Sequence, residues 1–131
     1  LKTWNLVSHV EVYIGEGYSV ASRDGQGVAK YKMRTKGLCR VLRPLKNPDM
    51  DAAMLWFYRE ANGQKYDRLG LLVFTLAAKH GSMKKMFCSE FATRFYRNAK
   101  IKPFNPSYDA DRIAPAQFLQ SAAFEDFWSM I

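Results

Sequence analysis

The stretch KKMFCSEFATRFYRNAK, residues 84–100, has the spacing of an amphipathic helix. Cys88 begins a series of small and apolar residues that recur at helical intervals on one face: Phe91, Ala92, Phe95 and Ala99. We therefore predict a buried stripe that starts with Cys88 in the first turn of this helix. A cysteine there is either a packing residue or a nucleophile, because free N–H groups and the dipole at a helix N-terminus favour the thiolate.

Upstream of this helix, the N-terminal part of the chain alternates as β-strands do. In SHVEVYIGEGYSVAS (8–22), Val10, Val12 and Ile14 share one face, and the glycines of GEG suit a tight hairpin turn. Residues 28–33 and 37–45 are predicted to form two further strands. Cys39 lies in the second of these, where we expect it to be a small core residue.

After residue 45 the period changes from that of a strand to that of a helix. Asn47 is predicted to cap a helix with Pro48 at its first position, ending at the Asn62-Gly63 pair. Residues 66–81 are a second, very apolar helical candidate, with His80 in its last turn, where the helix dipole stabilises it. A short helix is predicted from Pro115 in an otherwise irregular tail. This order predicts one α+β domain, residues 1–131, with a small antiparallel sheet packed on helices.

A nucleophilic cysteine needs a base, and His9 is the candidate. It lies on the predicted first strand, on the face opposite Val10, and a sheet packed on the Cys88 helix would present it to the thiol. Such a histidine needs a third group to fix its tautomer. Glu11 points the same way along the strand, and Ser22 or Asp24 could lie beside His9 across the hairpin, depending on its register.

Composition limits the other functions that the chain could have. The net charge of +8 comes from 20 Lys and Arg against 12 Asp and Glu, which favours an anionic partner such as a cell-wall polymer, a lipid surface or nucleic acid. Because the basic residues are scattered, we interpret them as a solvated surface and do not expect nucleic acid. No apolar run approaches the roughly 18 residues of a membrane span. Metal-ligand spacings and a phosphate loop are absent from the sequence, so we expect no metal and no cofactor.

Four segments in this order resemble the circularly permuted papain-like cysteine hydrolases: SHVEVYIGEG (8–17), GQKYD (63–67), FCSEF (87–91) and DRIAPAQFLQS (111–121). The resemblance is to the YiiX/YebB-like branch of the NlpC-type superfamily, which is related to the lecithin:retinol acyltransferase-like enzymes. It implies a permuted papain-like fold in which the strand bearing the histidine precedes the helix bearing the cysteine.

By position, the resemblance makes Cys88 the nucleophile, His9 the general base and Glu90 a structural residue at the helix start. Two departures stand out. Val20 and Ala21 occupy the stretch where the family carries its third polar group, which leaves Ser22 as the nearest substitute there. The family's upstream strand with a Gly-Asp pair has no counterpart in LKTWNLV (1–7), and because Leu1 is not a start methionine we expect residues to precede it.

The resemblance implies a thiol hydrolase that cleaves an amide, ester or thioester bond through an acyl-enzyme, on cell-wall peptides or other acyl substrates, in a phage or a bacterium. One alternative is a lipid acyltransferase or phospholipase of the same fold. Another is a non-catalytic basic binding module or virion component. Two free thiols fit a reducing interior, so we expect a soluble protein of the cytoplasm or one associated with a virion.

Overall fold

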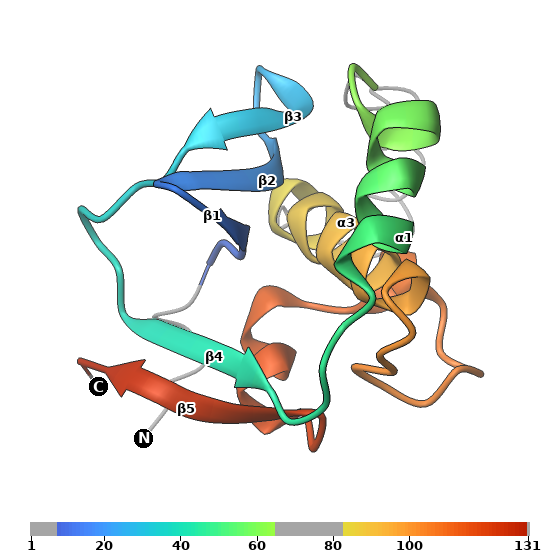
Figure 1. Cartoon of the computed structure of the whole chain (residues 1–131). Helices are drawn as coiled ribbons and strands as arrows, with labels where there is room; N and C mark the ends of the chain where they lie inside the picture. The colour runs from blue at the N-terminus through green and yellow to red at the C-terminus, as the bar shows by residue number, and fades with distance from the viewer. Residues whose placement is uncertain (1–7, 65–82, 131) are drawn as a thin grey trace.

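Two separate antiparallel sheets form the β part of this fold. The structure, a computed structural model, describes residues 8–64 and 83–130. One sheet has the order β1-β2-β3 and consists of β1 (Val12–Gly15), β2 (Tyr18–Arg23) and β3 (Gly27–Lys32). The second sheet pairs β4 (Arg40–Pro44) with β5 (Phe124–Ser129), and Figure 1 shows it below the first. The α+β class is confirmed, but the single predicted sheet is wrong, because β4 pairs with the C-terminal strand.

The predicted hairpin over residues 8–22 is confirmed as β1 and β2, but β1 begins only at Val12, so the prediction that His9 lies on a strand is wrong. Val12 pairs with Val20 and Tyr13 with Ser19. The turn between the strands needs positive φ angles at three successive residues, Gly15 (100°), Glu16 (56°) and Gly17 (83°). Glycine adopts such angles without a steric penalty, so the GEG sequence favours this turn. β3 then pairs with β2, with Arg23 opposite Gly27.

The first helix, α1 (Met50–Trp56), continues directly into a π-helical turn, Phe57–Ala61. Its cap is Asp49, whose side chain accepts a hydrogen bond from the Ala52 N–H at 3.0 Å, so the prediction of Asn47 as cap is wrong by two positions. The helix ends before Asn62 and Gly63 as predicted. The predicted helix over 66–81, with His80, lies outside the described residues.

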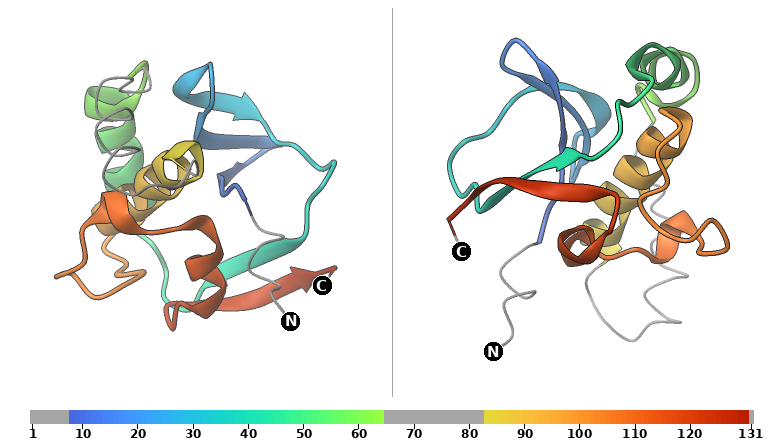
Figure 2. Two further views of the ribbon diagram at one scale, coloured as in Figure 1. Left: turned by 180° about the vertical axis from the view of Figure 1, so that it is seen from behind. Right: turned by 60° about the horizontal axis from the view of Figure 1, so that its bottom comes forward.

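The long helix α3 (Met83–Asn98) forms the centre of the fold. Figures 1 and 2 both show it between the first sheet and α1. Its predicted buried stripe is confirmed, since every member has 5% exposure or less: Cys88, Phe91, Ala92, Phe95 and Ala99. The four members other than Cys88 pack into one apolar core with Phe57 and with Val12, Val20 and Val28 of the sheet.

The C-terminal segment returns along α3 to the second sheet. It contains two short 3-10 segments, Ala110–Arg112 and Pro115–Gln120, the second of which begins where a short helix was predicted. β5 was not predicted. Cys39 precedes β4, is half-buried and donates from its thiol to the Gly37 carbonyl at 3.4 Å, so its assignment to a strand and to the core is wrong.

Candidate active site

The register of the β1–β2 hairpin determines which side chains surround Glu11. Continuing that register by one residue beyond the Val12–Val20 pair puts Glu11 opposite Ala21. Ser19 and Arg23 are then its diagonal neighbours on the same face of the sheet, at a distance that long side chains can bridge. The hairpin therefore gives Glu11 one hydroxyl and one guanidinium as neighbours.

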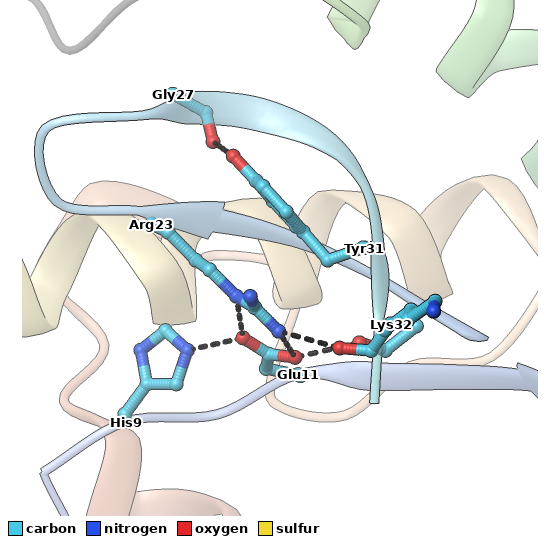
Figure 3. Close-up of polar contacts among 7 residues, drawn as sticks. His9, Glu11, Arg23, Gly27, Tyr31 and Lys32 are labelled. Carbon is cyan, nitrogen blue, oxygen red and sulfur yellow. Dashed lines mark hydrogen bonds and ion pairs between the residues drawn. The ribbon is translucent and has the colours of Figure 1, made fainter. Parts of the chain in front are cut away.

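Both neighbours bind the Glu11 carboxylate, and Figure 3 shows the contacts of Arg23. Oε1 accepts hydrogen bonds from Ser19 Oγ at 2.6 Å and from Arg23 Nη2 at 2.9 Å. Oε2 accepts from Arg23 Nε at 2.6 Å and contacts His9 Nε2 at 2.7 Å. Burial raises the pKa of this carboxyl, but Arg23, His9 and Ser19 together hold it well below its usual range. Glu11 is consequently ionised at neutral pH.

His9 lies just before β1 and connects this cluster to Cys88. Besides the contact of Nε2 with Glu11, the imidazole makes a side-chain hydrogen bond with Cys88. Because the ring has two nitrogens, the contact at Nε2 leaves Nδ1 for the sulfur. Burial lowers the pKa of His9, but the hydrogen bonds and charges of Cys88 and Glu11 outweigh it and raise the pKa to about 9. The ring is therefore mainly protonated at neutral pH, which suits it to face a thiolate.

Cys88 itself is completely buried in the face of α3 that packs on the core. The helix begins at Met83, so Cys88 lies in its second turn and the prediction of a first-turn cysteine is wrong. Only the first N–H groups of a helix lack an intrahelical partner, and the dipole effect falls off within the first turn. Among the described residues, the neighbour that can activate the thiol is therefore His9.

The two residues after Cys88 have structural contacts. Glu90 forms an ion pair with Arg94 one turn further along α3, at 3.1 Å, so its predicted place at the helix start is wrong. The buried Ser89 donates a hydrogen bond to the carbonyl of Ile113. This bond joins two of the segments that carry the family resemblance, FCSEF and DRIAPAQFLQS, because it fixes the C-terminal segment to α3 beside the cysteine.

Of the three candidates for the third polar group, Glu11 contacts the imidazole. Ser22 is buried in β2, where it pairs with Val28, and Asp24 is exposed in the turn that follows β2. The sequence does not reveal the roles of Ser19 and Arg23. The hairpin register is the feature that could have identified them. Once Val12 is paired with Val20, Ser19 and Arg23 both lie diagonal to Glu11.

A cleft of about 620 Å³ opens beside this cluster, between the first sheet and the second. His9 and Glu11 are part of its wall, and 34% of the His9 side chain is exposed there. The rest of the lining combines apolar residues, such as Val41, Leu42 and Phe124, with basic ones, such as Arg34 and Lys36. A molecule bound in this cleft would therefore contact His9 and not Cys88.

Within residues 8–64 and 83–130, no group of three or more His, Cys, Asp or Glu side chains could hold a metal ion. None of the helices in these ranges combines the length and apolarity needed to cross a membrane. Comparisons with protein-family models, with curated proteins and with solved structures found no match.

Proposed function

We propose that the protein is a thiol hydrolase in which Cys88 is the nucleophile, His9 the acid and base, and Glu11 the group that orients His9. The observation that carries this proposal is the position of His9, whose ring contacts Cys88 and, at Nε2, the Glu11 carboxylate. A buried cysteine that served only for packing would not need a charged imidazole and a fixed carboxylate beside it.

The reaction begins from the thiolate–imidazolium pair. The Cys88 sulfur attacks a carbonyl carbon, a C–S bond forms, and the protonated His9 donates its proton to the leaving nitrogen or oxygen as the scissile bond breaks. Neutral His9 then takes a proton from water as the water oxygen attacks the thioester. The tetrahedral intermediate that the water forms then collapses and its C–S bond breaks. This step releases the carboxylic acid and restores the thiolate and the imidazolium. Glu11 remains ionised throughout and holds the Nε2 proton.

We further propose that the fold is the permuted papain-like one. The order of the functional elements supports it, since the strand region with His9 comes first in the chain and the helix with Cys88 follows. Glu11, two residues after the histidine, takes the role for which the family resemblance offered only Ser22. The tie between Ser89 and Ile113 also joins two of the matching segments.

The burial of Cys88 adds a requirement to this proposal. Its side chain has no exposed surface, so a carbonyl group reaches the sulfur only if the covering atoms move aside. A small reagent should therefore react with Cys88 faster than a bulky one.

The first experiment measures carboxamidomethylation of Cys88 against pH, by mass spectrometry, in the parent chain and in His9→Ala. Cys39 serves as an internal control because it is half-buried and has a backbone carbonyl, not an imidazole, as its partner. We expect Cys88 to react already at pH 6–7 and to lose that reactivity in His9→Ala, because an unperturbed cysteine, with a pKa of about 8.5, is mostly thiol there. If Cys88 is as slow as Cys39 at every pH, the hydrolase proposal fails and the basic binding module becomes the better interpretation.

A lipid acyl substrate is the second candidate, and the apolar lining of the cleft favours it. The two candidates differ in their dependence on acyl-chain length. A lipid-directed enzyme should hydrolyse nitrophenyl esters faster as the acyl chain grows from two to eight carbons, whereas a peptide-directed amidase should not. Both activities should be absent in Cys88→Ala.

A further inference from the structure

Arg23, at the end of β2, is a buried cation that the reaction outlined above does not use. Only 9% of its side chain is exposed, and its guanidinium is held from three directions. It binds Glu11 through Nε and Nη2, at 2.6 and 2.9 Å, and Nη2 also donates to the Lys32 carbonyl at 3.1 Å. The ring of Tyr31 lies against it, 4.1 Å from the guanidinium carbon to the ring centre.

Tyr31 is itself fixed, because its hydroxyl donates to the Gly27 carbonyl at 2.6 Å (Figure 3). The contacts form a continuous series that runs from β3 through Arg23 and Glu11 to the ring of His9. The two-point contact of a guanidinium with a carboxylate fixes the plane of the carboxylate as well as its position, which one ammonium group cannot do.

We propose that Arg23 is a positioning residue of the active site: it sets the plane of the Glu11 carboxylate and, through it, the tautomer and orientation of His9. This inference rests on the proposed function for its consequence at Cys88, but the arrangement of His9 can be measured without any reaction. Arg23 touches neither the imidazole nor the thiol in the contacts described here, so its effect passes through Glu11.

The physical reason lies in the free rotation of a glutamate side chain. With several rotatable bonds, Glu11 can place its carboxylate in many orientations, and Ser19 alone restrains only one oxygen. Arg23 restrains both oxygens and leaves Oε2 directed at His9 Nε2. A proton held at Nε2 keeps Nδ1 available for the sulfur of Cys88.

The test compares Arg23→Lys and Arg23→Gln with Lys30→Gln in the full chain. Lys30 is a suitable control because it lies on the same sheet, is exposed and contacts the ring of Tyr18 instead of Glu11. Nitrogen NMR of the imidazole, assigned with His9→Gln and recorded above the pKa of about 9, where the ring is neutral, reports the tautomer of His9. We expect both Arg23 variants to lose the single Nε2-protonated signature there and to slow alkylation of Cys88 at neutral pH roughly ten-fold or more, and Lys30→Gln to change neither.

Arg23→Gln leaves the Glu11 carboxylate buried without its cation, so the substitution is also made in the Glu11→Gln background, where both side chains of the double variant are neutral. If Arg23 acts through Glu11, Arg23→Gln has no further effect on His9 or on Cys88 once Glu11 is glutamine. An unchanged His9 signature in Arg23→Lys and Arg23→Gln, with only a lower melting temperature, would overturn the inference. A slow Cys88 in the parent chain would instead overturn the proposed function, while the NMR comparison would still decide the role of Arg23.

Discussion

Two arginine–carboxylate pairs, Arg23–Glu11 at the first sheet and Arg43–Glu125 on the second, are chemically alike but differ in exposure. Arg23 and Glu11 join β2 to the start of β1, and their side chains are 9% and 15% exposed. Arg43 and Glu125 join β4 to β5 at 2.9 Å, with 58% and 46% exposure. The first carboxylate also contacts His9 and Ser19, whereas the guanidinium of the second pair lies over the ring of Phe127 in solvent.

This difference separates a pair that orients other groups from one that only joins two strands. Water competes for the exposed pair and screens it, so it contributes little to stability. The buried pair has lost its water, and each ion depends on the other and on the remaining hydrogen bonds. Its position is fixed as a result, and that is what the proposed role of holding His9 requires.

The largest effect is expected on removing the buried carboxylate. Glu11→Ala leaves the charge of Arg23 buried and unpaired, which should lower the free energy of unfolding by about 3–5 kcal/mol. Urea denaturation of the variant and the parent measures this loss. If Glu11→Ala and Glu125→Ala lower the free energy of unfolding equally, the two pairs contribute equally to stability despite their different exposure.

The buried pair should also make the free energy of unfolding depend on pH in acid, and this effect should be smaller. The folded-state pKa of Glu11 is lowered from 4.5, so its contribution to stability is complete above that pH and is lost as the pH falls further. Below pH 4.5 the free energy of unfolding should therefore fall more steeply in the parent than in Glu11→Gln, by up to about 1.4 kcal/mol per pH unit for one proton. Parallel curves between pH 4.5 and 2.5 would contradict this expectation.

The smallest effect is expected at the exposed pair. Glu125→Ala should change the free energy of unfolding by less than about 1 kcal/mol, and that change should shrink further in 1 M salt. The alkylation rate of Cys88 should stay at the parent value. A larger loss that persists at high salt would mean that the Arg43–Glu125 pair stabilises the fold as much as the Arg23–Glu11 pair does.

Sequence patterns predicted the parts of the fold that local forces determine. Alternation and the GEG turn located the hairpin, and the helical spacing from Cys88 to Ala99 located the buried face of α3. The same patterns placed the start of α3 too late, because apolar spacing identifies a face and not the helix end. β5 was missed because Phe124–Ser129 has no clean alternation, and it becomes a strand by pairing with β4.

For the candidate site, the sequence alone determined the residue types. It supplied a cysteine on a buried helix face, a histidine in a predicted strand and a glutamate two residues later. The tertiary structure decided which of these groups meet. His9 reaches Cys88 only when the sheet packs on α3, and Arg23 reaches Glu11 only through the hairpin register, because contacts between distant residues depend on packing and strand pairing rather than on local spacing.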